Sequence, residues 1–173
     1  MKEGYGKGDS MERSQKINLL RSRLKELGKV AIAFSGGVDS TFLLKVAYDV
    51  LGENAVAITI KAPIHPQWEF DETKKLVKQI GAQHICVDYN IFDIEGFAEN
   101  PPERCYICKK KLFSLIKEIA EKHNIPYILD GSNYDDINDY RPGMRALQEL
   151  QVLSPLKECE MTKEDIRYFS REL

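Results

Sequence analysis

The sequence has little of what marks a membrane-spanning, secreted or disulfide-stapled protein. It contains four cysteines and one tryptophan in 173 residues, and cysteine this sparse does not form a disulfide framework. Its apolar runs are short, residues 30–34 being among the longest, whereas a membrane helix needs about 20 apolar residues. Residues 1–10 hold no apolar segment of the kind that a signal peptide requires. We therefore expect a cytoplasmic protein without membrane association.

An excess of charge of one sign is also missing. The 25 basic and 27 acidic residues give a net charge of −2, and nucleic-acid-binding domains are usually strongly basic. Nucleic acid is therefore not an expected partner. Hydrophobic residues make up 43% and charged residues 30% of the chain, as is typical of a folded domain rather than a disordered one.

Short apolar runs alternate with segments that have helical periodicity. The predicted strands are 30–34, 55–60, 84–88, 126–130 and 152–156, and the predicted helices are 12–27, 40–51, 68–80, 108–123, 142–150 and 162–173. This alternation predicts a three-layer α/β/α, Rossmann-like fold with a five-stranded, mostly parallel sheet. Residues 1–11 are expected to form a flexible tail and residues 12–173 the domain.

The clearest motif follows the first predicted strand and opens a helix. Its residues are Ala33, Phe34, Ser35, Gly36, Gly37, Val38, Asp39 and Ser40. Glycines let the backbone approach an anion, successive N–H groups form a nest, and the helix N-terminus adds its positive dipole end. A carboxylate here would repel phosphate unless a cation lay between, so Asp39 is predicted to hold Mg²⁺. No Gly-Lys-Ser/Thr follows, which disfavours a Walker A loop; a plain turn is the alternative.

The Ser-Gly-Gly-x-Asp-Ser pattern resembles the pyrophosphate-loop ATPases, or adenine nucleotide alpha-hydrolase superfamily. Residues 101–109, 130–146 and 154–156 are similar to the LarE family of ATP-dependent sacrificial sulfur transferases, which build the nickel-pincer cofactor. The resemblance implies that ATP adenylates a carboxylate of a pyridinium mononucleotide, that pyrophosphate leaves, and that sulfur is then transferred. It also implies a homo-oligomer and a further segment after Leu173. The last predicted helix has no stop signal, which fits a fragment of a longer protein and equally fits a native chain that ends in a helix.

Polar residues follow the second and fourth predicted strands, at the sheet edge where ligands of open α/β sheets bind. We expect the backbone around Lys61 to read the adenine edge and Gly131 to let a ligand approach closely. Asn133 or Asp135 is expected to bind ribose hydroxyls or Mg²⁺. An ordinary loop and a turn capped by Asx side chains are the alternatives.

Two arginines, Arg141 and Arg145, lie four residues apart and share one face if Pro142 starts a helix. Such a pair can clamp a phosphate or carboxylate and offset charge in a transition state. With Asp39 they are the predicted catalytic residues. The alternative is a pair of solvated surface arginines.

The cysteine pair Cys105 and Cys108 lies near the start of a predicted helix, beside cationic residues that lower a thiol pKa. Three interpretations stay open: structural residues, two ligands of a metal site, and a thiol–disulfide or sulfur-carrier pair. A single C-x-x-C supplies half of a four-ligand site. The resemblance implies a [4Fe–4S] cluster in some LarE-type proteins, whose third ligand would lie beyond this chain.

Two other functions stay open. One is another pyrophosphate-loop ligase, similar to the NAD and GMP synthetases or to the tRNA thiolases. The other is a regulator that binds ATP without turnover. Release of pyrophosphate rather than phosphate separates these possibilities.

Overall fold

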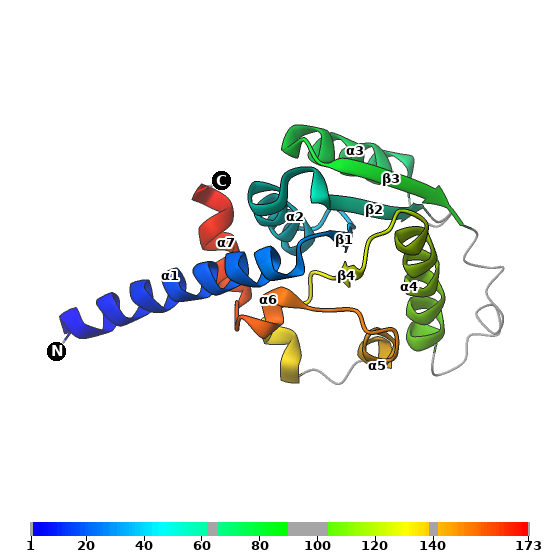
Figure 1. Ribbon diagram of the computed structural model, residues 1–173. Coiled ribbons are helices and arrows are strands. Elements are labelled where there is room, and N and C mark those ends of the chain that lie inside the picture. Colours follow the sequence, from blue (N-terminus) through cyan, green and yellow to red (C-terminus); the bar gives the residue numbers. More distant parts are fainter. Residues whose placement is uncertain (1, 62–65, 90–103, 139–141, 173) are drawn as a thin grey trace.

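The computed structural model of the chain describes residues 2–61, 66–89, 104–138 and 142–172 (Figure 1). The strands are β1 (Val30–Ala33), β2 (Ala55–Lys61), β3 (Gln83–Asp88) and β4 (Tyr127–Leu129). The α-helices are α1 (Lys2–Leu27), α2 (Val38–Leu51), α3 (Gln67–Ile80), α4 (Arg104–Lys122), α5 (Pro142–Glu149), α6 (Pro155–Glu158) and α7 (Lys163–Glu172). Two 3-10 helices, η1 (Gly52–Asn54) and η3 (Tyr134–Asn138), complete the described elements.

The sheet is parallel and has the strand order β3-β2-β1-β4. The chain builds outward from β1 through β2 to β3 and then returns to the other side of β1. In sheets of this kind ligands bind where the strand order reverses, outside the carboxyl ends of the strands. The reversal places that point between β1 and β4.

Helices cover both faces of the sheet, so the predicted three-layer α/β/α architecture is confirmed. Helices α1, α2 and α7 pack on one face, where Leu24, Leu43 and Ile166 are fully buried. Helices α4 and α5 pack on the other face, where Ile116 and Leu147 join the apolar side chains of β1 and β2. Each burial of such a side chain contributes about 1.5–3 kcal/mol. Among the described residues, no helix is both long and apolar enough to cross a membrane.

The prediction of a fifth strand over 152–156 was wrong. Within the described residues the sheet has four strands, and this segment adds a single parallel bridge, Leu153 to Leu129. The strand cannot extend in either direction. The N–H of Val152 donates to the carbonyl of Leu147 and so closes α5, while Pro155 lacks an N–H and begins α6.

Helix α1 begins at Lys2 rather than near residue 12, so the predicted start of the first helix was also wrong. Residues 2–11 contain no proline, the residue that most effectively stops a helix. The N-terminal part of α1 extends away from the rest of the molecule (Figure 1). The boundary between a flexible tail and the domain at residue 11 stays a prediction.

Candidate functional site

Of the two glycines in the loop between β1 and α2, Gly36 has the positive φ that the motif predicts, whereas Gly37 has a φ of −70°. Gly36 has a φ of +86°, in the region that favours glycine. A Cβ on Gly36 would also lie 2.9 Å from Oγ1 of Thr73, which is buried on α3. Gly36 is therefore required twice: by its backbone conformation and by the packing of α3 against the loop.

Hydroxyl groups inside the loop hold it in shape. Oγ of Ser35 lies 3.2 Å from Oγ of Ser40, and the N–H of Gly37 donates to Oγ of Ser35 over 3.4 Å. Gly37 is the N-cap of α2 and provides no side-chain cap. The first N–H groups of a helix without such a cap are free to bind an anion.

Asp39 lies at the centre of a polar contact between three segments. Its Oδ2 accepts a hydrogen bond of 3.1 Å from Nδ2 of Asn133 in the segment after β4. Its Oδ1 lies 2.9 Å from Nζ of Lys163 in α7. Asn133 is buried, whereas Asp39 and Lys163 keep 23% and 34% of their side-chain surface exposed, so both charges remain accessible to a ligand.

Sequence reasoning missed Lys163. A lysine in the first turn of a helix faces the positive end of the helix dipole and is unfavourable there. Asp135 offsets this cost in part, because its Oδ2 accepts the backbone N–H of Lys163 at 2.9 Å. A lysine at an unfavourable helix position is the signal that would have found this residue.

The segment after β4 packs directly against the start of α2. A Cβ on Gly131 would lie 3.0 Å from the backbone N of Ser40, so the close approach that Gly131 permits is to this helix. The carboxylate of Asp130 is buried and accepts hydrogen bonds from the hydroxyls of Ser132, at 2.6 Å, and Ser154, at 2.5 Å. The structure thus brings this segment and the phosphate loop together, as the sequence predicted.

Asn133 and Asp135 also make the turn contacts of the alternative interpretation. Oδ1 of Asn133 accepts the N–H of Asp135 at 2.9 Å, and the N–H of Asn133 donates to Asp136 at 3.0 Å. These bonds order the turn and leave the predicted contacts with ribose or Mg²⁺ as predictions.

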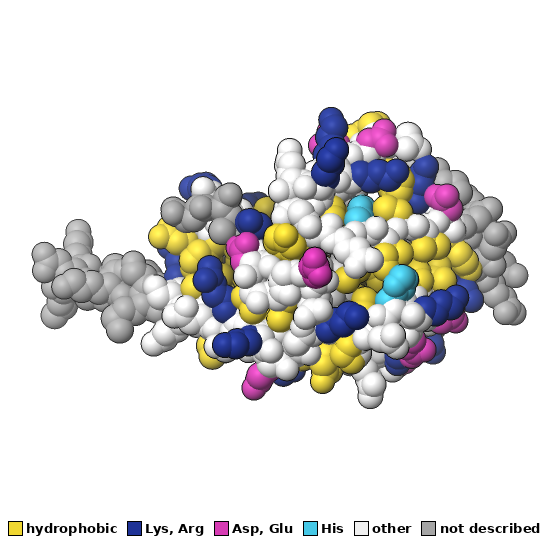
Figure 2. Space-filling model, turned by 45° about the horizontal axis from the view of Figure 1, so that its top comes forward, with side chains coloured by type: hydrophobic (Ala, Val, Ile, Leu, Met, Phe, Trp, Pro, Cys, Tyr) yellow, Lys and Arg dark blue, Asp and Glu magenta, His cyan; other side chains and the backbone are white. Residues whose placement is uncertain are grey.

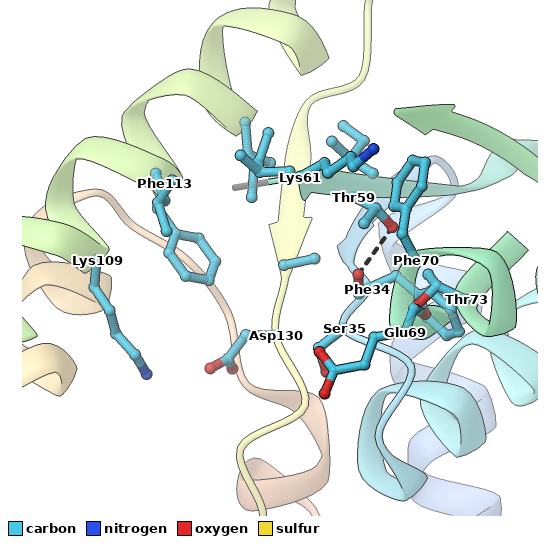
Figure 3. A pocket seen from close by; sticks show the side chains of 15 residues that line it. Phe34, Ser35, Thr59, Lys61, Glu69, Phe70, Thr73, Lys109, Phe113 and Asp130 are labelled. Carbon is cyan, nitrogen blue, oxygen red and sulfur yellow. Dashed lines mark hydrogen bonds between the residues drawn. The ribbon is translucent and has the colours of Figure 1, made fainter. Parts of the chain in front are cut away.

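A pocket of about 360 Å³ opens at the carboxyl edge of the sheet, between α3 and α4 (Figure 3). Its walls are mostly apolar and carry four charged side chains, of Lys61, Glu69, Lys109 and Asp130. Lys109 and Asp130 point toward one another across it (Figure 3). Nζ of Lys61 donates to Gln67 at 2.6 Å and lies 4.9 Å from the ring centroid of Phe70.

On the face in Figure 2, acidic and basic side chains are interspersed, and hydrophobic ones gather near the centre.

His84 supports the floor of this pocket. The hydroxyl of Thr59 donates to the carbonyl of Phe34 at 2.9 Å and so accepts the Nε2–H of His84 at 2.7 Å. Burial, with a smaller contribution from the charge of Lys74, lowers the pKa of His84. His84 thus holds the Thr59 side chain, and Thr59 in turn holds the carbonyl of Phe34 at the start of the phosphate loop.

The predicted arginine pair is described only in part. Arg141 lies outside the described residues. The guanidinium of Arg145 lies 4.1 Å from the ring centroid of Tyr106 in α4, and its Nε lies 3.8 Å from Oε1 of Glu149. Tyr106 donates to the same carboxylate at 2.5 Å. Arg145 thus joins α5 to α4, and its catalytic role stays a prediction.

The cysteine pair lies in the first turns of α4, which begins at Arg104, earlier than predicted. The side chains of Cys105 and Cys108 lie outside the described ones. Elsewhere, burial raises the pKa of Cys86 and raises that of Cys159 to about 11, so neither forms a reactive thiolate at neutral pH. Within the described ranges, no three His, Cys, Asp or Glu side chains are grouped to hold a metal ion.

Comparison with known proteins agrees with this geometry. The family model described as NAD synthase matches residues 13–112. The chain belongs to the NAD synthase family, within the pyrophosphate-loop superfamily. The chain also shares its fold with the glutamine-dependent NAD⁺ synthetase of Acinetobacter baumannii, which was solved in complex with ADP. The TM-score is 0.72 at 15% identity, over 94% of this chain and 32% of the other.

Two curated relatives are more similar in sequence. An uncharacterized protein of Synechocystis is 41% identical over 91% of this chain and 59% of its own length. The pyridinium-3,5-bisthiocarboxylic acid mononucleotide synthase of Lactiplantibacillus plantarum is 38% identical over 89% of this chain and 56% of its own length. The chain thus spans less than two thirds of each. The predicted resemblance to pyrophosphate-loop proteins and to LarE is confirmed, and no comparison supports the predicted iron–sulfur cluster.

Proposed function

We propose that this chain binds ATP with Mg²⁺ and activates a carboxylate by adenylation, the first half of an ATP-dependent sulfur transfer. The single observation that carries the proposal is the contact of Asp39 with Asn133 and Lys163 beside the uncapped N-terminus of α2. It combines anion-binding N–H groups, a carboxylate for a cation and an ammonium group within one site.

The phosphate chain of ATP occupies the loop in this proposal. The N–H groups at the start of α2 and the hydroxyls of Ser35 and Ser40 donate to phosphate oxygens. Lys163 adds a positive charge that offsets the charge of the leaving pyrophosphate. Asp39 suits Mg²⁺ because both its oxygens keep a free lone pair after the contacts with Asn133 and Lys163. When bound, Mg²⁺ supplies charge neutralisation between Asp39 and the phosphates.

The nucleoside occupies the pocket beside the loop. The pocket is continuous with the phosphate loop through Ala33, Phe34 and Ser35, and it reaches the end of β2 at Lys61. Backbone groups at that strand end face the adenine edge, and apolar side chains from α3 and α4 enclose it. The fold neighbour from Acinetobacter baumannii was itself solved with an adenine nucleotide.

The carboxylate substrate is a pyridinium mononucleotide, by analogy with the product named for the Lactiplantibacillus plantarum relative. A carboxylate oxygen attacks the α-phosphorus, the bond to pyrophosphate breaks, and an acyl adenylate forms. A sulfur nucleophile then adds to the acyl carbon, and AMP leaves with the former carboxylate oxygen. Lys109 in the pocket wall, with Arg141 and Arg145, supplies positive charge for the substrate. The expected homo-oligomer and cytoplasmic location stay predictions.

The test is to incubate the protein with ATP, Mg²⁺ and a pyridinium dicarboxylate mononucleotide and to identify the products. From the wild type we expect pyrophosphate and the acyl adenylate, together with AMP where water hydrolyses the acyl adenylate. We expect a loss of about 10²-fold or more in Asp39→Asn, because electrostatic catalysis of this kind contributes about that much. Asp49→Asn, at the other end of α2 and paired with Lys45, is the matched control. Formation of ADP and phosphate would contradict the proposal, as would full activity of Asp39→Asn.

A further inference from the structure

Glu69 is a carboxylate in the pocket that the proposed chemistry leaves without a role. It lies in the first turn of α3 and lines the same pocket as Ser35 of the phosphate loop (Figure 3). Its carboxylate makes no hydrogen bond or ion pair with another side chain among the described residues. The other two acids of α3 differ in this respect, since Asp71 accepts from Gln67 at 3.1 Å and Glu72 pairs with Lys75 at 3.9 Å.

The position of Glu69 relative to the loop is fixed by Thr73, one helical turn later on the same face. The hydroxyl of Thr73 donates to the backbone carbonyl of Glu69 at 2.9 Å. The same oxygen is the atom that a Cβ on Gly36 would meet. This face of α3 is therefore packed against the loop, with Glu69 at the pocket end of the contact.

An ionised carboxylate accepts hydrogen bonds and donates none, so it recognises hydrogen-bond donors. The phosphates of ATP at neutral pH carry none. The donors of the nucleotide are the ribose hydroxyls and the adenine amino group. In the proposed placement adenine lies at the end of β2 and the phosphates lie at the loop, so the ribose lies between them, beside Ser35.

We infer that Glu69 accepts hydrogen bonds from the ribose hydroxyls and makes this site selective for ribonucleotides over deoxyribonucleotides. The inference rests on the proposed ATP site and adds the residue that reads the sugar. Open α/β proteins that bind dinucleotides use an acidic side chain for the same purpose. A hydrogen bond to a charged acceptor corresponds to about ten- to a hundredfold in affinity.

The experiment measures the affinities of ATP, 2′-deoxyATP and 3′-deoxyATP by calorimetry for the wild type, Glu69→Gln and Glu72→Gln. Glu72→Gln is the matched control, because Glu72 lies on the same helix and pairs with Lys75 outside the pocket. We expect the wild type and Glu72→Gln to bind ATP about tenfold or more tightly than at least one deoxynucleotide. In Glu69→Gln, ATP affinity falls toward the level of that deoxynucleotide and the difference shrinks, because a neutral amide oxygen is a weaker acceptor than a carboxylate.

A preference for ATP that persists undiminished in Glu69→Gln would overturn the inference, as would ATP binding without any ribose preference in the wild type. The titrations are repeated at low and high Mg²⁺ concentration. If Glu69→Gln weakens all three nucleotides equally and only at low Mg²⁺, Glu69 acts on the cation and the ribose assignment is wrong. Failure of the wild type to bind any of the nucleotides would instead overturn the proposed ATP site itself.

Discussion

Asp165 joins the first and last helices of the domain, and replacing it should destabilise the fold in a pH-dependent way. Its side chain is 6% exposed. It accepts hydrogen bonds from Lys16 at 2.8 Å and Arg13 at 3.0 Å in α1, and from the N–H of Thr162 at 3.1 Å at the start of α7. Burial alone would raise the pKa of Asp165, but these bonds outweigh it and lower the pKa from 3.8 to about 2.

The size of the effect follows from this shift. Each pKa unit corresponds to 1.36 kcal/mol of preference for the charged form, so the ionised Asp165 stabilises the folded state by about 2 kcal/mol. Because the folded pKa is the lower one, the contribution is fully present above about pH 4, the unfolded value, and is lost as the pH falls through about 2. Asp165→Asn should remove about 2 kcal/mol at pH 7.

The assay is urea unfolding of the wild type and Asp165→Asn between pH 7 and about pH 2. The difference in the free energy of unfolding should be about 2 kcal/mol at pH 7 and shrink below about pH 4. Glu164→Gln is the control: Glu164 lies 3.5 Å from the same Arg13 but is 85% exposed, so its loss should change stability by less than about 1 kcal/mol. Equal stability of Asp165→Asn and wild type at pH 7 would refute the reasoning, as would a difference that is constant with pH.

Two further substitutions test the phosphate loop and the positive charge of Lys163 beside it. Gly36→Ala should cost about 1–3 kcal/mol of unfolding free energy and abolish ATP binding in calorimetry. Gly28→Ala is the control, because Gly28 has a φ of +80° but no atom within 4 Å of the added Cβ. It should lower stability without affecting ATP binding. Lys163→Met should weaken ATP binding by about tenfold. Lys45→Met, which removes a surface partner of Asp49, should leave ATP binding unchanged. Equal ATP affinities in the two lysine variants would count against the role of Lys163.

Local pattern in the sequence predicted most of the fold and the centre of the site. Apolar runs marked β1 and β2, because strands buried on both faces are almost wholly aliphatic. The glycine motif predicted the loop and the placement of Asp39, since backbone conformation there depends on neighbouring residues. The rule that parallel strands share one carboxyl edge placed the segment of Asn133 at the same edge as the loop, but it did not predict the contact of Asn133 with Asp39.

Features that depend on contacts between distant residues could not be predicted in this way. Lys163 reaches Asp39 across 124 positions of sequence, and only the packing of α7 against α2 brings them together. The wrong prediction of a fifth strand had the same cause. The composition of residues 152–156 suits a strand, but the N–H of Val152 bonds to Leu147 at the end of α5, and Pro155 begins α6. Glu69 gave no sequence signal because an acid in the first turn of a helix is common for electrostatic reasons.

The most direct test of the central claim follows an oxygen atom. The pyridinium dicarboxylate mononucleotide is prepared with a heavy-oxygen label in its carboxylates and incubated with the protein, ATP and Mg²⁺, and the products are analysed by mass spectrometry. If a carboxylate oxygen attacks the α-phosphorus, the label appears in the phosphate group of the acyl adenylate and of the AMP released when water attacks its acyl carbon, and the pyrophosphate is unlabelled. Label in inorganic phosphate, or unlabelled AMP that has taken its oxygen from water, would contradict adenylation of the carboxylate.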